Sequence, residues 1–167
     1  MSIFKQGSIL LPKINFESLD FEYRKFQDEN TLKRWKEIGH LYEKYSGLTL
    51  EKNKSHPEWV DVIEKEFNLE SITSCVYCMT PGTIMPEHQD FYKKYRSLYN
   101  LSDSKNICRV IVFLEDWKSG HYFEINKIPI VNWKAGDFVF WRNDTSHMAA
   151  NIGTDNRYTL QITGIDV

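Results

Sequence analysis

The sequence predicts a mainly β protein in which eight strands form two facing sheets, with helices from the N-terminal part packed on one sheet. From about residue 70 onward, short apolar and β-branched runs alternate with turn-forming Gly, Pro, Asn, Asp and Ser residues. Before residue 70, the apolar residues recur at helical intervals instead. Because 167 residues suit one domain, we expect a single domain, 1–167, with a helical or irregular part at 1–70 and a jelly-roll core at 71–167.

Two helices are expected in the N-terminal part. The first is indicated by apolar residues at spacings of three and four, followed by Gly47 as a stop signal. These residues are Leu32, Trp35, Ile38, Leu41, Tyr42 and Tyr45. The second helix is expected at about 57–67, because Pro57 is typical of a first turn and Ser55 and Glu58 have the spacing of a capping box.

Strands and turns account for the rest of the chain. The strands are expected at about 71–79, 83–90, 107–115, 121–125, 128–132, 137–142, 146–151 and 157–165. Eight short strands after a helical segment fit a double-stranded β-helix, the cupin-like jelly roll. The longest break, 91–106, is rich in tyrosine and basic residues, and it is either a lid over a binding site or a solvated loop.

The charge balance excludes several classes of protein. The 21 basic and 23 acidic residues give a formal net charge of −2, which argues against a protein that coats nucleic acid or binds an anionic membrane surface. No apolar run approaches the roughly 20 residues of a membrane helix. The expected partners are therefore a small molecule or a peptide, and the sequence leaves the oligomeric state open.

The cysteines and the first residues indicate a compartment. Three cysteines are an odd number, and the first six residues lack the apolar core of a secretory signal, so we expect a cytoplasmic protein. Cys75 and Cys78 form a C-x-x-C motif, but residues three apart on a strand point to opposite faces. A zinc or redox role for this pair is therefore disfavoured.

A candidate metal site begins at the end of the second predicted strand. His88 and Asp90 are two residues apart, so on a strand both side chains project from the same face. Alone, such a pair is more typical of a surface ion pair. His147 opens the seventh predicted strand, which lies beside the second in an eight-stranded jelly roll. Two imidazoles and one carboxylate would then occupy one face of a metal ion and leave the other face open, as in non-haem Fe(II) oxygenases.

Arg157 follows His147 by ten residues and lies on the last predicted strand. Arginine suits a buried carboxylate, because its planar fork binds both oxygens and remains charged. The alternative is a salt bridge to Asp155 or Asp144 at the surface.

In this order, these residues resemble the Fe(II)- and 2-oxoglutarate-dependent dioxygenases, most of all the prolyl-hydroxylase and aspartyl/asparaginyl-hydroxylase type. The resemblance covers about 72–165, and its matching stretches are 77–90, 109–117, 133–141 and 147–164. It implies Fe(II) held by His88, Asp90 and His147, with 2-oxoglutarate as cosubstrate and its distal carboxylate on Arg157. It also implies that O2 is consumed to hydroxylate a C–H bond of a small molecule or of a prolyl, Asp or Asn side chain.

Three more residues are expected around the cosubstrate. Thr159 and Gln161 share the face of Arg157 by strand alternation. Many relatives place a tyrosine on the third strand near Phe113, which has no hydroxyl, so Tyr77 is expected to take that contact.

Four other residues are expected to lie outside the site. Arg109 either faces the mouth of the substrate site or pairs on the outer face of its sheet, and the outer face is the expected position. His40, His56 and His121 are expected to be structural.

The last two predicted strands are expected to form a hairpin that turns His147 and Arg157 into the barrel. Since faces alternate along paired strands, this requires a five-residue loop at 152–156 or a bulge at Gly153. Either arrangement would turn Gln161 toward the metal.

Two other functions stay open. A non-oxidative metal-binding cupin, such as an isomerase or epimerase, would not need Arg157 aimed at the metal. A non-catalytic jelly-roll binding module would have no tight metal site. Hydroxylation by an Fe(II)- and 2-oxoglutarate-dependent enzyme is the function that the ordered set of residues favours.

Overall fold

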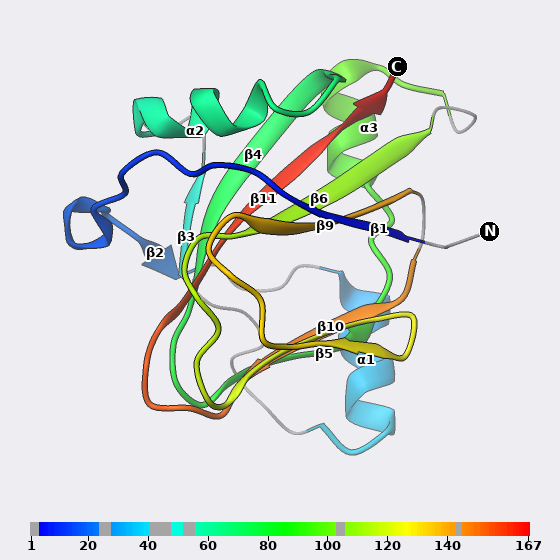
Figure 1. Cartoon of the computed structure of the whole chain (residues 1–167). Coiled ribbons are helices and arrows are strands. Elements are labelled where there is room, and N and C mark those ends of the chain that lie inside the picture. The colour runs from blue at the N-terminus through cyan, green and yellow to red at the C-terminus, as the bar shows by residue number, and fades with distance from the viewer. Residues whose placement is uncertain (1–3, 24–27, 41–47, 52–55, 103–105, 143–144) are drawn as a thin grey trace.

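Two antiparallel sheets face each other in the computed structural model (Figure 1). The described residues are 4–23, 28–40, 48–51, 56–102, 106–142 and 145–167. The larger sheet has the order β1 (Phe4–Ser8), β9 (Asp137–Arg142), β6 (Ile107–Phe113), β11 (Arg157–Asp166), β4 (Leu69–Met79), β3 (Leu48–Glu51) and β2 (Glu22–Tyr23). The smaller sheet has the order β5 (Thr83–His88), β10 (His147–Asn151), β7 (His121–Ile125) and β8 (Ile128–Ile130).

All eight predicted strands are present as β4 to β11, and the predicted jelly roll is confirmed. Sequence reasoning missed β1, β2 and β3, which extend the two edges of the larger sheet, and a 3-10 helix at Phe16–Ser18. β1 pairs with β9 along its whole length, from Phe4 opposite Trp141 to Ser8 opposite Asp137. Because the side chains of β1 are mostly exposed, it shows no apolar alternation, and backbone pairing alone marks it as a strand.

The first predicted helix is present as α1 (Glu29–Glu37), while residues 41–45 lie outside the described part of the chain. The Asp28 carboxylate caps α1 by accepting a backbone N–H of the first turn at 2.8 Å. Trp35 is fully buried, and its indole N–H donates to the carbonyl of Glu87 on β5 at 2.9 Å. α1 therefore lies beside the smaller sheet (Figure 1).

The second predicted helix is present as α2 (Glu58–Glu64) and begins after Pro57, as expected. No side chain caps it, and Ser55 lies outside the described residues. Val60 and Ile63 are buried against the apolar outer face of β4, β6 and β11. α2 thus covers the larger sheet, and the two N-terminal helices are divided between the two sheets (Figure 1).

The stretch 91–106, expected to be a lid or a loop, contains a helix, α3 (Lys93–Tyr99). Two tyrosine hydroxyls tie α3 to the first residues of β4: Tyr95 donates to the carbonyl of Ser71 at 2.6 Å, and Tyr99 to that of Ile72 at 3.0 Å. The expectation of an irregular segment is therefore wrong for α3, which packs on the end of the larger sheet.

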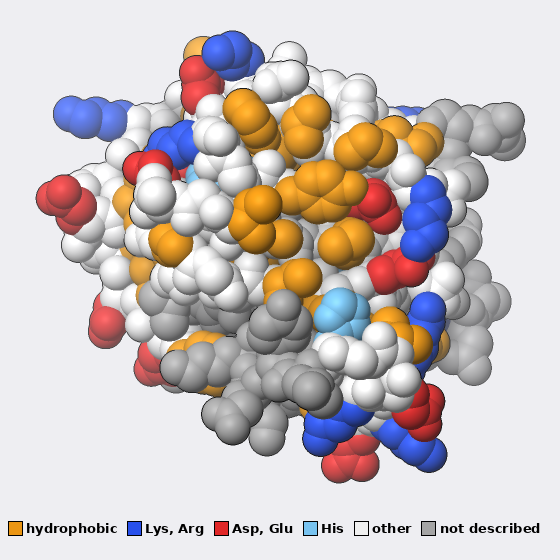
Figure 2. Space-filling view, turned by 90° about the horizontal axis from the view of Figure 1, so that it is seen from below, with side chains coloured by type: hydrophobic (Ala, Val, Ile, Leu, Met, Phe, Trp, Pro, Cys, Tyr) orange, Lys and Arg blue, Asp and Glu red, His pale blue; other side chains and the backbone are white. Residues whose placement is uncertain are grey.

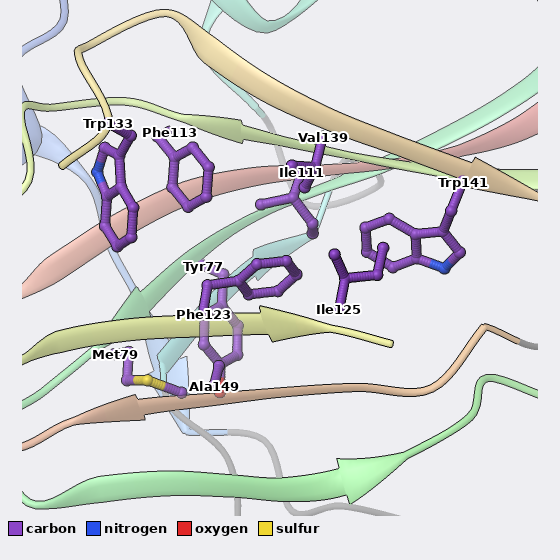
Figure 3. Close-up of a cluster of buried hydrophobic side chains, with 10 residues drawn as sticks. All are labelled: Tyr77, Met79, Ile111, Phe113, Phe123, Ile125, Trp133, Val139, Trp141 and Ala149. Carbon is purple, nitrogen blue, oxygen red and sulfur yellow. The ribbon is translucent and has the colours of Figure 1, made fainter. Parts of the chain in front are cut away.

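An aromatic core fills the space between the sheets (Figure 3). Its buried members are Tyr77, Met79, Ile111, Phe113, Phe123, Ile125, Trp133, Val139, Trp141 and Ala149. They come from both sheets, and the rings of Phe113 and Trp133 stack at 4.0 Å. This inner core differs from the aliphatic layer under α2, so the larger sheet is covered on both faces.

The predicted hairpin between the last two strands does not form, because β10 and β11 belong to different sheets. β10 pairs with β5 and β7, whereas β11 pairs with β4 and β6. The connecting segment 152–156 crosses from one sheet to the other, as jelly-roll topology requires. Although the predicted register is wrong, His147 and Arg157 both face the interior.

The surface has two further features. A hollow of about 510 Å³ lies between β1, the start of β9 and residues 129–133, and none of its lining residues belongs to the predicted site. Apolar side chains also gather on the face seen from below (Figure 2). Within the described residues, no helix is both long and apolar enough to cross a membrane.

Candidate metal centre

The three predicted metal ligands lie together where β5 and β10 meet. His88 is the last residue of β5, His147 is the first of β10, and the two are paired across the smaller sheet. Asp90 follows β5 by two residues. One ligand atom from each side chain lies within 4.8 Å of the others, and the described residues contain no second group of this kind.

The distance from each histidine to Asp90 suits one metal ion. Nε2 of His88 lies 3.9 Å from Oδ1 of Asp90, and Nε2 of His147 lies 3.9 Å from Oδ2. Two ligand atoms that each bind an ion at about 2.1 Å can be at most about 4.2 Å apart. Both separations therefore fall within the reach of a single ion.

Backbone carbonyls orient both imidazoles. Nδ1 of His88 lies 2.8 Å from the carbonyl oxygen of Pro86, and Nδ1 of His147 lies 2.9 Å from that of Thr145. A carbonyl can only accept, so Nδ1 is the N–H in each ring and Nε2 keeps its lone pair. Both rings thus present a metal-binding nitrogen toward Asp90.

Aromatic rings pack against the two histidines, and the resulting burial helps to keep the imidazoles neutral. The Trp35 ring meets His88 edge-on at 5.6 Å, and the Trp141 ring lies 5.0 Å from His147. Burial, followed by repulsion from His147, lowers the pKa of His88 to about 4. Burial also lowers the pKa of His147. Neutral imidazoles are the form that binds metal.

Arg109 lies inside the barrel, so its expected position on the outer face is wrong. Its Nε and Nη2 donate to Oδ2 of Asp90 at 3.1 and 2.7 Å, and its Nη1 donates to Oγ1 of Thr163 at 2.6 Å. Burial opposes ionisation of Asp90, but Arg109 and the two imidazoles hold the pKa of this carboxyl well below its usual value. Asp90 is therefore charged and ready to bind a cation.

Arg157 is buried at the start of β11, with 3% of its surface exposed. Its Nη1 donates across to the carbonyl of Tyr122 on β7 at 2.9 Å and lies 3.5 Å from the sulfur of Met79, while its Nε has no partner. The contacts of Arg157 do not include the alternative salt bridge to Asp155, and Asp144 lies outside the described residues. Burial lowers the pKa of Arg157 to about 10, so it is a cation at neutral pH with no described carboxylate beside it.

The other residues expected around the cosubstrate share this interior face. Thr159 lies opposite Tyr77 on one side and Phe113 on the other, and all three are buried. Oγ1 of Thr159 has no hydrogen-bond partner. Gln161 is half-buried two residues further along β11, toward the metal ligands.

The remaining histidines lie apart from the triad. His56 lies 3.1 Å from Asp61, and Nε2 of His121 lies 3.1 Å from the carbonyl oxygen of Asp155. His40 follows α1, and its backbone N–H donates to the carbonyl of Trp35 at 2.9 Å.

The C-x-x-C motif lies on β4, and its two residues point to opposite faces, as predicted. Cys75 lies opposite Gln161 on the inner face, whereas Cys78 lies opposite Tyr158 on the outer face. Neither cysteine forms a disulfide, and burial raises the pKa of Cys78 to about 11. Neither residue belongs to the candidate metal group.

Sequence reasoning placed Arg109 on the wrong face of its sheet and missed the aromatic side chains around the site. A signal for Arg109 was present: it precedes Ile111 by two residues and Phe113 by four, so strand alternation places all three on one face. Trp35 gave no such signal, because the apolar stripe of a helix does not say which sheet it covers.

No protein-family model and no curated protein matches this sequence. Solved structures do match it. The viral collagen prolyl hydroxylase of Paramecium Bursaria Chlorella virus-1, in its 2OG complex, gives a TM-score of 0.59 at 12% identity, covering 99% of this chain and 97% of that chain. A Pseudomonas putida prolyl-4-hydroxylase gives 0.55 at 15% identity, covering 83% of both chains.

A Schizosaccharomyces pombe Cnp3 cupin domain also matches, with a TM-score of 0.43 at 15% identity, covering 71% of this chain and 64% of that chain. Identities this low show a common fold and leave activity to be argued from the site. The chain therefore shares the double-stranded β-helix fold of the two matched prolyl hydroxylases, and it has a His-Asp-His group that could hold a metal ion.

Proposed function

We propose that this protein is an Fe(II)- and 2-oxoglutarate-dependent dioxygenase that hydroxylates its prime substrate. Arg157 supports this most strongly. Its guanidinium is buried, has an unpartnered Nε and faces no described carboxylate. Burying a cation without a counter-ion is unfavourable, so the interior of the barrel is suited to an anionic group of a ligand.

The triad would hold the iron. His88 and His147 supply neutral Nε2 atoms and Asp90 supplies a carboxylate, a donor set that suits Fe(II) and leaves one face of the ion open. When bound, iron with 2-oxoglutarate and O2 supplies the oxidation of a C–H bond. The contribution of the chain is to orient these ligands through the carbonyls of Pro86 and Thr145 and to exclude water with aromatic side chains.

The spacing between Arg157 and the triad suits 2-oxoglutarate. Arg157 contacts Tyr122, which lies opposite Ala150, and Ala150 is three residues beyond His147 on β10. Three strand residues span about 10 Å. The five-carbon chain spans about 5 Å, and a metal–oxygen bond and a hydrogen bond add about 5 Å more. One dicarboxylate can therefore bridge the metal and the arginine.

Two hydroxyl-bearing residues complete the proposed carboxylate site. Oγ1 of Thr159 is buried and unpartnered, and Tyr77 lies directly opposite Thr159 on β4. Both can donate to a carboxylate that already accepts from Arg157. Gln161, nearer the triad, would line the path between the carboxylate site and the iron.

The prime substrate is proposed from the matched structures. The two with TM-scores above 0.5 are prolyl hydroxylases, so a peptidyl proline is the first substrate to test. Asp or Asn side chains and small molecules are the next candidates.

The deciding experiment is conversion of 2-oxoglutarate to succinate by protein loaded with Fe(II), under O2 and without prime substrate. The wild type should form succinate slowly, His147→Ala should form none, and Arg157→Ala should raise the KM for 2-oxoglutarate at least about tenfold, or about 1.4 kcal/mol. Arg142→Ala is the matched control, because Arg142 pairs with Asp166 at the exposed end of the larger sheet.

Two results would overturn the proposal. Protein that binds Mn(II) but not 2-oxoglutarate would be a non-oxidative cupin. Protein that binds neither would be a jelly-roll binding module.

A further inference from the structure

We propose that Arg109 is a positioning residue that confines Asp90 to one metal-binding oxygen and so keeps a coordination position open for the cosubstrate. This inference rests on the proposed function, because it assigns a role toward the metal of that same site.

The two oxygens of Asp90 have unequal surroundings. Oδ2 accepts two hydrogen bonds from Arg109, from Nε at 3.1 Å and from Nη2 at 2.7 Å. A carboxylate oxygen has two lone-pair directions, so both directions of Oδ2 are used. Oδ1 accepts no hydrogen bond from the described residues and lies 3.9 Å from Nε2 of His88, whereas Oδ2, which lies 3.9 Å from Nε2 of His147, already accepts from Arg109 twice. Oδ1 is therefore the oxygen left for a metal ion.

Arg109 is itself held in place on three sides. Its Nη1 donates to Oγ1 of Thr163 on β11 at 2.6 Å, and its guanidinium carbon lies 5.5 Å from the centre of the Tyr92 ring. Trp141 lies opposite it on β9. A guanidinium fixed by a hydrogen bond, an aromatic face and a neighbouring indole cannot turn away from Asp90 without leaving its own N–H groups buried and unpaired.

Whether Asp90 binds the metal through one oxygen or two decides how many coordination positions of the ion remain open. Two histidines and a one-oxygen carboxylate use three positions of a six-coordinate ion and leave three. A carboxylate that binds through both oxygens uses one more and leaves two. The positive charge of Arg109 also offsets the negative charge of Asp90. The site with its metal ion bound therefore keeps the full positive charge of the ion, which attracts the dianionic oxoacid.

Arg109→Gln tests this role with Mn(II) as the probe ion. The number of bound waters is measured from the broadening of the Mn(II) EPR lines in 17O-enriched water. We expect about three waters in the wild type and about two in Arg109→Gln. The dissociation constant for 2-oxoglutarate should rise at least about tenfold, or about 1.4 kcal/mol, while Mn(II) remains bound.

Three variants keep the test decisive. Thr163→Val removes the acceptor of Nη1 and should give a smaller change in the same direction. Arg109→Lys keeps the charge but loses the paired donors, so it should lose the third water with a smaller loss of oxoacid affinity. Arg142→Gln removes an arginine–carboxylate pair elsewhere on the larger sheet and should resemble the wild type. If Arg109→Gln fails to fold, Arg109→Lys and Thr163→Val decide the question.

An unchanged water number and unchanged oxoacid affinity in the folded Arg109 and Thr163 variants would overturn this inference. It would leave the proposed function intact, provided that Mn(II) binding still depends on His88 and His147. If the His88→Ala and His147→Ala variants bind Mn(II) as tightly as the wild type does, the proposed function itself is overturned.

Discussion

The hydroxyl of Thr159 lies buried on the inner face of β11 without a hydrogen-bond partner, four residues or about 13 Å along the strand from Thr163, whose hydroxyl accepts from Arg109. One face of β11 thus carries one threonine hydroxyl without a hydrogen bond and one with a hydrogen bond. An unsatisfied buried hydroxyl disfavours folding, whereas a hydrogen-bonded one stabilises the fold. We therefore assign the Thr159 hydroxyl to ligand binding and the Thr163 hydroxyl to holding Arg109 in place.

Thr159→Val should therefore leave the free energy of unfolding unchanged or raise it by up to about 1 kcal/mol, because it removes an unpaired polar group. It should weaken 2-oxoglutarate binding several-fold. Thr163→Val, the matched control, should lower the free energy of unfolding by about 1–2 kcal/mol. Urea unfolding and titration calorimetry measure both quantities, and a large destabilisation by Thr159→Val would contradict a ligand role.

Arg157→Lys keeps the charge at the carboxylate site but loses the planar fork. Oxoacid binding should weaken by about 1–3 kcal/mol, while the affinity for Mn(II) alone should barely change, since Arg157 contacts β7 and β4 and not the triad. Calorimetry with and without 2-oxoglutarate separates the two effects. Equal losses of affinity for 2-oxoglutarate and for Mn(II) would indicate damage to the barrel and count against a specific role of Arg157 in binding the oxoacid.

The candidate site was partly readable from single residues. The spacing of His88 and Asp90 and the position of His147 at the start of a neighbouring strand predict the triad, because strand alternation and jelly-roll order determine both. The side on which Arg109 pairs was misjudged. A lone arginine on a predicted strand is usually exposed, and only the core positions Ile111 and Phe113 show that it faces inward.

At the level of elements, two glycines close the end of the barrel near Arg157. Gly120 precedes β7 with a φ of 88°, and a Cβ there would lie 2.3 Å from the backbone nitrogen of Gly153, in the segment that crosses to β11. Neither backbone can move away, since the N–H of Ile152 donates to the carbonyl of Gly120 at 2.9 Å. The residue before β7 is therefore held against the segment that leads from β10 toward β11.

Gly120→Ala should destabilise the protein by about 3 kcal/mol or more, because a backbone clash adds to the strain of a left-handed residue. Gly82→Ala is the matched control: its φ is 78°, but a Cβ there has open space, so it should cost only about 1 kcal/mol. Urea unfolding of the two variants measures the difference. Equal losses would show that backbone conformation, not the contact with Gly153, requires glycine.

The eight core strands could be predicted because their side chains alternate between two covered faces or are bounded by turn residues. β1 could not, since it is an edge strand whose side chains are mostly exposed. α3 left a signal that was not used: Tyr92, Tyr95 and Tyr99 follow helical intervals, and two of their hydroxyls bond β4. The pairing of β10 and β11 was mispredicted because sequence-adjacent strands often form hairpins, whereas here the chain changes sheets.

At the scale of the whole molecule, the proposed ligands join the two sheets. The triad lies mainly on the smaller sheet, while Arg157, Thr159 and Arg109 belong to the larger one. A metal and an oxoacid bound together would connect the sheets through contacts that the unfolded chain cannot make. Binding should therefore stabilise the fold as a unit.

At 100 times their dissociation constants, Mn(II) and 2-oxoglutarate together should raise the free energy of unfolding by at least about 2.7 kcal/mol, which corresponds to roughly 5–10 °C in Tm. His147→Ala should lose most of this shift and Arg157→Ala only the part due to 2-oxoglutarate. Calorimetric melting of the three proteins provides the comparison. A shift that survives His147→Ala would place the metal elsewhere.

The most direct test is a crystal structure of the protein soaked with Mn(II) and 2-oxoglutarate under anaerobic conditions, with data collected at the manganese absorption edge. Our account predicts one anomalous peak bound by His88, Asp90 and His147, with oxoacid density running from the metal to a carboxylate on Arg157. It also predicts that Asp90 binds through a single oxygen while Arg109 holds the other. An anomalous peak away from the triad, or an oxoacid whose distal carboxylate does not meet Arg157, would contradict it.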